Sequence, residues 1–81
     1  MKTELIRAIG LELADIRRNK ELSIIRVAKN TGLNKDMISK YENGNSSMKI
    51  YLLEDLVSYY GLNLAIFFKN VYDKLQKKES E

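Results

Sequence analysis

Cysteine, histidine, proline and tryptophan are all absent from this chain of 81 residues. Without cysteine the chain can form neither a disulfide nor a thiolate metal site. Without histidine it lacks the commonest general base and the commonest metal ligand. The carboxylates do not compensate, because Asp36 and Glu42 are not at a same-face helical spacing and Glu54 and Asp55 are adjacent. The sequence therefore predicts no enzyme activity, no cofactor and no metal.

Long apolar runs are missing too. No segment approaches the roughly 20 residues of a membrane span, and Glu4 comes too early for a secretory signal. These features predict a cytoplasmic location, with which the lack of cysteine agrees. The length allows one domain with a small core. We expect that domain to cover residues 1–78, with a charged, frayed tail over residues 79–81.

Glycine is scarce, and its four positions are informative: Gly10, Gly32, Gly44 and Gly61. Three of them stand where helical patterns stop, as glycine does at helix C-terminal caps. Gly10 instead lies within the first helical pattern, where it costs about 1 kcal/mol relative to alanine. A second helix is therefore expected to approach closely at Gly10.

Apolar residues recur at helical spacing along most of the chain and predict an all-α fold class, a compact five-helix domain. The expected helices cover about residues 3–19, 24–30, 35–42, 48–60 and 63–77. The residues expected to cap the first four are Thr3, Ser23, Asn34 and Ser47. The stripe expected on the fourth helix is Ile50, Leu53, Leu56, Val57 and Tyr60. An alternative for residues 64–68 is a short strand that pairs with a second subunit.

Residues 23–44, SIIRVAKNTGLNKDMISKYENG, predict two short helices joined by a tight turn at residues 31–33. This is a helix-turn-helix, whose usual ligand is DNA and whose second helix enters the major groove. Four polar side chains face away from the apolar residues of that helix, and we expect them to read bases: Lys35, Asp36, Ser39 and Lys40. Asp36 has an equally plausible structural role, holding Lys35 or complementing the helix dipole. Met37 is expected to pack inward rather than touch a thymine methyl.

Positive charge is concentrated around this segment. Residues 17–49 contain eight basic and three acidic residues, a net +5, which leaves −2 for the rest of a chain whose total is +3. A polyanionic partner requires such a concentration, although lysine and arginine are also ordinary on solvated helices. The expected phosphate contacts, from side chains or from backbone N–H groups at helix ends, are Arg17, Ser23, Arg26, Asn43, Gly44 and Lys49.

The last expected helix has a wide apolar face for the terminal element of so small a domain. That face could simply complete the core, or it could also form a homodimer interface. The residues expected at the interface are Phe68, Val71, Tyr72 and Leu75.

Several short features add to this pattern: Ile9-Gly10, Leu22-Ser23, Val27-Ala28, Gly32-Leu33, Ile38-Ser39, Glu42-Asn43-Gly44 and Tyr60-Gly61-Leu62. At these spacings the chain resembles the Cro/phage-repressor-type helix-turn-helix regulators, with a lambda-repressor-like DNA-binding domain, from about Ile9 to Phe68. The resemblance implies five helices and dimers on two-fold DNA operators. It also implies that Arg17 pairs with Glu42 and can touch a phosphate while anchoring the second helix of the motif.

Two positions depart from that family. Ile24 replaces a phosphate-binding glutamine, and it is expected to pack on the first helix or to contact a protein. Glu21 replaces a glycine, so the backbone there is expected to differ slightly. The function expected overall is a dimeric repressor of a phage or mobile-element operon. The alternatives are a restriction–modification controller protein, an antitoxin that binds a toxin as well as its operator, and a protein-interaction adaptor.

Overall fold

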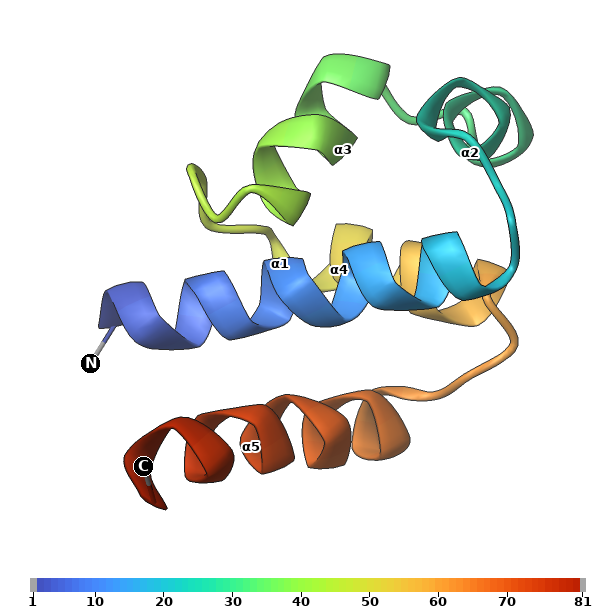
Figure 1. The fold of residues 1–81 in the computed structure, drawn as a ribbon. Helices are drawn as coiled ribbons and strands as arrows, with labels where there is room; N and C mark the ends of the chain where they lie inside the picture. Colours follow the sequence, from blue (N-terminus) through green and yellow to red (C-terminus); the bar gives the residue numbers. More distant parts are fainter. Residues whose placement is uncertain (1, 81) are drawn as a thin grey trace.

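The computed structural model describes the backbone of residues 2–80 and the side chains of residues 3–76. Its five helices are α1 (Lys2–Asn19), α2 (Ile24–Thr31), α3 (Lys35–Glu42), α4 (Ile50–Tyr59) and α5 (Leu64–Ser80) (Figure 1). The expected all-α class is confirmed, and α3 has the expected bounds. The alternative strand over residues 64–68 was wrong, because α5 begins at Leu64 and stays helical.

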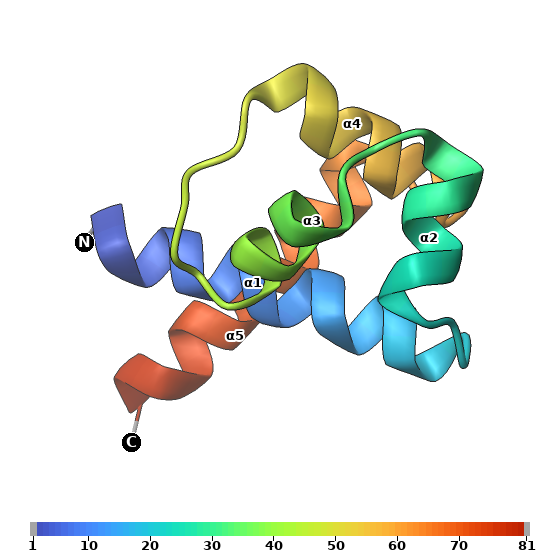
Figure 2. The ribbon, with the colours of Figure 1, turned by 90° about the horizontal axis from the view of Figure 1, so that it is seen from above.

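Helix α1 is the central element. Figure 1 shows α3 on one side of α1 and α5 on the other, and these two helices make the most extensive contacts with α1. Helices α1 and α5 run antiparallel, so the start of α1 and the end of α5 lie at the same end of the molecule (Figure 1). Helix α2 packs against α3 and α4, beside the C-terminal end of α1 (Figure 2). The helix-turn-helix and α5 therefore lie on opposite sides of one long helix.

One core holds all five helices together. Every helix contributes at least one of the large side chains that are fully buried: Leu13, Val27, Ile38, Leu56, Val57, Phe67 and Val71. Full burial of such a side chain stabilises a fold by about 1.5–3 kcal/mol. The expected stripe of α4 is correct except for Ile50, which is 60% exposed at the start of the helix.

A polar cluster joins α1 to α5. Glu12 is buried, and its carboxylate accepts a hydrogen bond from Asn70 Nδ2 at 3.2 Å. The Lys74 ammonium lies 3.3 Å from Glu12 Oε1 and 2.8 Å from Asp15 Oδ2. Its hydrogen bonds, first to Asp15 and then to Glu12, raise the pKa of Lys74 above its ordinary value. The cluster thus provides the partners that a buried carboxylate requires.

Gly10 brings α1 against the end of α3, as its position predicted. A Cβ atom at Gly10 would lie 2.6 Å from the carbonyl oxygen of Glu42 and closer still to that of Tyr41. Both obstacles are backbone atoms, so no side-chain rotation can relieve the contact. Only glycine therefore permits this approach between α1 and α3.

Left-handed residues end the first four helices. Glu21, Gly32, Gly44 and Gly61 have φ values of 57°, 79°, 72° and 81°. At the end of α1, the N–H groups of Glu21 and Leu22 donate to the carbonyls of Arg18 and Arg17, at 2.9 and 3.1 Å. This is a Schellman motif. The expected change of backbone at Glu21 was wrong, because this glutamate adopts the left-handed conformation that glycine favours.

Two of the four predicted N-terminal caps are confirmed, and two are wrong. Ser23 and Asn34 cap α2 and α3 with their side-chain oxygens, as expected. Thr3 cannot cap α1, because the helix already includes Lys2. Ser47 does not cap α4, which begins at Ile50 after Lys49 and has no side-chain cap.

The chain end remains a prediction in part. Helix α5 extends through Ser80, and Glu81 lies outside the described residues, so the frayed tail over residues 79–81 stays a prediction. Among the described helices, none combines the length and the apolar character needed to cross a membrane.

Candidate nucleic-acid interface

The turn between α2 and α3 is tight and hydrogen-bonded. Gly32 adopts φ 79°, and its N–H donates to the carbonyl of Ala28 at 2.9 Å. Thr31 Oγ1 donates to the carbonyl of Val27 at 2.8 Å and accepts the N–H of Leu33 at 3.2 Å. The expected turn at residues 31–33 is therefore confirmed, and it sets α3 at a steep angle to α2 (Figure 1).

Helix α3 buries one face and presents the other to solvent. Ile38, Tyr41 and Glu42 are buried, and Met37 packs inward against the core, as predicted. The structure brings the four expected base-reading residues together on the opposite face, with Ser39 half-buried and the others exposed: Lys35, Asp36, Ser39 and Lys40. Their placement fits a recognition helix; their contacts with bases stay a prediction.

Arg17 and Glu42 form the pair that the family resemblance implied. Arg17 Nε donates to Glu42 Oε2 at 2.8 Å, and Nη2 donates to Oε1 at 3.0 Å. The third nitrogen, Nη1, donates to the carbonyl of Leu22 at 2.8 Å. The hydrogen bond to Glu42 raises the pKa of Arg17 above its already high ordinary value. One guanidinium thus connects the end of α1, the segment before α2 and the end of α3.

This geometry changes the role expected of Arg17. Its side chain is only 11% exposed and that of Glu42 only 6%, so little of the guanidinium is open to a phosphate. We therefore assign Arg17 to holding α3 in place. Tyr60 lies close to the pair, and burial, followed by the charge of Glu42, raises the pKa of its hydroxyl to about 12.

The other expected phosphate contacts divide by accessibility. Ser23, Arg26, Asn43 and Lys49 are exposed, and Ser23 Oγ accepts the N–H of Arg26 at 3.1 Å. Gly44 needs a correction, because its N–H donates to the carbonyl of Tyr41 at 3.2 Å within the Schellman motif that ends α3. That N–H has no hydrogen left for a phosphate, so the role of Gly44 is its left-handed conformation.

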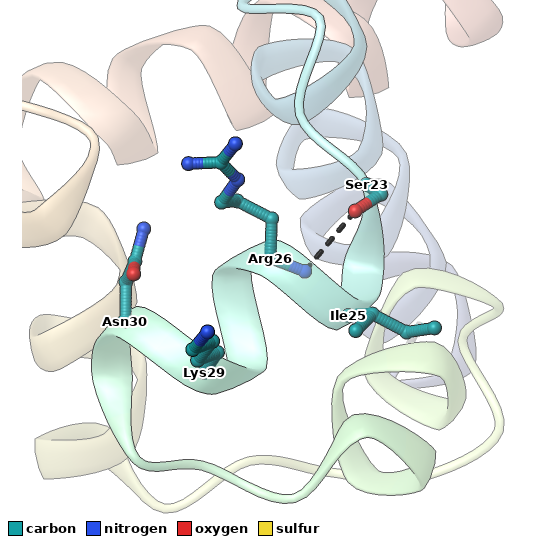
Figure 3. A pocket seen from close by; sticks show the side chains of 5 residues that line it. All are labelled: Ser23, Ile25, Arg26, Lys29 and Asn30. Carbon is teal, nitrogen blue, oxygen red and sulfur yellow. Dashed lines mark hydrogen bonds between the residues drawn. The ribbon is translucent and has the colours of Figure 1, made fainter.

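The outer face of α2 carries polar groups beyond those expected. An open hollow of about 340 Å³ is lined by Ser23, Ile25, Arg26, Lys29 and Asn30 (Figure 3). Arg26 and Asn30 extend from the same side of α2, and Asn30 Nδ2 donates to the Tyr59 hydroxyl of α4 at 2.8 Å. The spacing of three residues from Arg26 could have identified Lys29. The contact with Tyr59 has no sequence signal, because it joins residues distant in the chain.

The departure from the family at Ile24 is explained by packing. Ile24 is half-buried and packs against the core, as one of the two expected roles required. Its neighbour Ile25 is 66% exposed.

Most basic side chains around the helix-turn-helix are exposed and form no ion pair among the described residues, so they are available to a ligand. Of the eight basic residues in 17–49, only Arg17 forms an ion pair with another described residue. The remaining seven are all exposed: Arg18, Lys20, Arg26, Lys29, Lys35, Lys40 and Lys49. Within the described part of the chain, no acidic side chains gather in a group that could hold a metal ion.

The expected dimer residues of α5 do not share one environment. Val71 is fully buried within its own protomer, so its assignment to an interface was wrong. It faces the core because it stands one helical turn after Phe67, which is also fully buried. Tyr72 is 53% exposed, and Phe68 and Leu75 are half-buried beside it on one flank of α5.

Two capped helices, a tight turn and an outward polar face on the second helix define a helix-turn-helix DNA-binding domain. The comparisons agree: the chain belongs to the helix-turn-helix domain family, whose match covers residues 8–65. The resemblance to Cro/phage-repressor-type regulators is thereby confirmed. No curated protein matches the sequence.

Solved structures share the whole fold. The clp gene regulator ClgR from Corynebacterium glutamicum is 18% identical with a TM-score of 0.88, over 94% of this chain and 81% of that one. The restriction–modification controller protein C.Esp1396I was solved as a tetramer with its natural 35-base-pair operator. It is 19% identical with a TM-score of 0.81, over 89% of this chain and 95% of that one.

Proposed function

We propose that this chain is a sequence-specific transcriptional regulator, not an enzyme, which binds a two-fold DNA operator as a homodimer and acts most simply as a repressor. The outer face of α3 carries the proposal. Its two lysines and its aspartate are exposed and form no ion pair with other described residues. The helix that presents them is held at its end by Arg17 and Glu42.

The two sets of polar residues suit different parts of DNA. Base edges in the major groove would be read by Lys35, Asp36, Ser39 and Lys40, since a lysine favours guanine O6 and N7. Phosphates would be bound by Ser23, Arg26, Lys29, Asn43 and Lys49, which are exposed around the motif. Phosphate contacts supply most of the affinity and base contacts supply the specificity.

The homodimer would use the flank of α5 that carries Phe68, Tyr72 and Leu75. This flank lies on the opposite side of α1 from α3, so a partner bound there leaves the recognition helix free (Figure 1). Two recognition helices in such a dimer would reach half-sites about 34–36 Å apart. Replacing Tyr72 with glutamate would place a charge in the interface, and the dimer should dissociate.

A second candidate is the controller of a restriction–modification system. The likeness to C.Esp1396I over 95% of its length favours it, and that protein was solved on an operator as a tetramer. The adaptor alternative conflicts with the net charge of +5 over residues 17–49. Neither the family match nor the similar solved structures support a toxin as a partner.

The test combines DNA selection with binding at several salt concentrations. The wild type should select a two-fold motif from random duplexes, and its affinity should fall steeply with salt, by roughly a thousandfold or more between 50 and 200 mM if six phosphates are bound. Binding without any selected motif would contradict sequence specificity. Sedimentation should show a dimer for the wild type and a monomer for Tyr72→Glu. Leu11→Glu, a matched change at a 55% exposed leucine of α1, should remain a dimer.

A further inference from the structure

Asp36 is the one acidic side chain on the outer face of α3. It lies one helical turn before Lys40, a spacing at which opposite charges commonly pair. The ion pairs among the described residues nevertheless join Arg17 to Glu42 and Lys74 to Glu12 and Asp15, and none includes Asp36. The Asp36 carboxylate is therefore exposed and forms no direct ion pair within this basic surface.

Capping does not explain this carboxylate. Asn34 Oδ1 already accepts the N–H groups of Asp36, at 2.8 Å, and Met37, at 3.2 Å. The first turn of α3 is thus capped by the neighbouring side chain, and the Asp36 carboxylate makes no hydrogen bond within the described part of the molecule. A cap hydrogen bond is therefore not what this carboxylate contributes, and its charge also suits the N-terminal end of α3.

A carboxylate is unfavourable near DNA unless a base contact offsets its charge. The phosphates repel it, so it must accept a hydrogen bond from a base to make a favourable contribution. In the major groove the donors are cytosine N4 and adenine N6, whereas guanine and thymine offer only acceptors and a methyl group. Adenine N6 stands beside the acceptor N7, which would repel the second carboxylate oxygen. Cytosine N4 has no such neighbour on its own base.

We infer that Asp36 determines specificity by accepting a hydrogen bond from cytosine N4 and by penalising every other base at that position. This inference rests on the proposed DNA-binding function. A C·G pair presents one donor beside two guanine acceptors, so an aspartate next to a lysine matches the whole pair. Each half-site should therefore contain a cytosine that Asp36 contacts. Lys35 or Lys40 should reach a guanine, either the one paired with this cytosine or one in the neighbouring base pair.

The carboxylate has opposite effects on the two kinds of binding. On the operator it contributes a base contact, so Asp36→Ala weakens binding roughly 5- to 10-fold. On scrambled DNA it contributes only repulsion, so the same change strengthens binding severalfold at low salt. A purely structural role would lower both affinities together, so the signs separate the two explanations.

The decisive experiment selects binding sites from random duplex DNA with the full chain, using the wild type and Asp36→Asn. An asparagine amide bonds adenine N6 and N7 in a bidentate manner. The preferred base at one position of each half-site should therefore change from cytosine to adenine, while the other positions stay unchanged. Asp73→Asn is the matched control, since it makes the same chemical change at an exposed residue of α5, and it should select the wild-type motif.

The outcomes are distinguishable. A wild-type motif that Asp36→Asn leaves unaltered would overturn the inference and leave the proposed function intact. A wild type that selects no motif would overturn both. Urea unfolding of each variant verifies that it is folded. If Asp36→Asn proves unstable, the opposite shifts expected for Asp36→Ala on operator and scrambled DNA decide the matter, and parallel losses would refute it.

Discussion

Replacing Gly10 with alanine should destabilise the protein, although the same change in an unobstructed helix stabilises it by about 1 kcal/mol. The reversal of sign comes from the contact between α1 and the end of α3. The new Cβ would lie 2.6 Å from the carbonyl oxygen of Glu42 and closer to that of Tyr41. Because both oxygens belong to the backbone, α1 and α3 must move apart.

The size of the effect follows from overpacking. Inserting a methyl group into a closely packed contact costs about 1–3 kcal/mol. Because both obstacles are backbone atoms, we expect the upper part of that range, about 2–3 kcal/mol, against a gain of about 1 kcal/mol in helix propensity. In a domain of this size each kcal/mol changes the melting temperature by about 4–8 °C. We therefore expect Gly10→Ala to melt several degrees below the wild type. Binding to the operator should also weaken, because the displaced carbonyls end the recognition helix.

Urea unfolding and thermal melting followed by circular dichroism would measure this change. Ala65→Gly in the exposed first turn of α5 provides the calibration, since it reports the helix propensity alone and should destabilise by up to about 1 kcal/mol. If Gly10→Ala were as stable as the wild type, or more stable, while Ala65→Gly behaved as expected, the close contact between α1 and α3 would be wrong.

Four further outcomes follow from the same geometry. Glu21→Gly should stabilise the fold by about 1 kcal/mol, because glycine adopts the left-handed conformation without strain. Glu21→Ala should not stabilise it, and equal urea midpoints for these two variants would refute the explanation. Glu42→Gln should destabilise by about 3 kcal/mol, because it leaves the buried Arg17 charge uncompensated; a loss under 1 kcal/mol in urea unfolding would mean that the pair is effectively solvated. The pKa of Tyr60 is about 12 in the fold and about 10 when unfolded, so its stabilising contribution is complete below pH 10 and is lost as the pH rises towards 12; melts across this range should show a smaller alkaline loss for Tyr60→Phe than for the wild type. Lys35→Ala should lower operator affinity by about 1–3 kcal/mol, and an equal loss on scrambled DNA would exclude a base contact.

The local features of the fold were predictable from the sequence. Helix periodicity and the side-chain caps Ser23 and Asn34 act within a few residues, so the sequence pattern predicts α3 to the residue. The helix-turn-helix and the Arg17–Glu42 pair were predictable for a second reason, since they recur in a recognisable family. The four polar positions of α3 lie on one face simply because helical spacing requires it.

What could not be predicted depends on contacts between distant segments. Val71 belongs to the core because α5 turns that face towards α1 and α4, and periodicity alone does not distinguish a core flank from an exposed one. Buried Glu12 depends on Asn70 and Lys74, more than fifty residues later. The Gly44 N–H is a different case, because the predicted bounds of α3 already placed it in the C-terminal cap, where it donates to the carbonyl of Tyr41.

The hydrogen bonds of Arg17 have a consequence for the thermodynamics of recognition. They fix the end of α3 relative to the preceding segments before any ligand arrives, so little backbone entropy remains to be lost on binding. On a preorganised surface of this kind, no ordering cost offsets the contact energy, so a difference in contact energy between two DNA sequences appears as a difference in affinity. Two DNA sequences should therefore be distinguished mainly by how long each complex survives rather than by how quickly it forms.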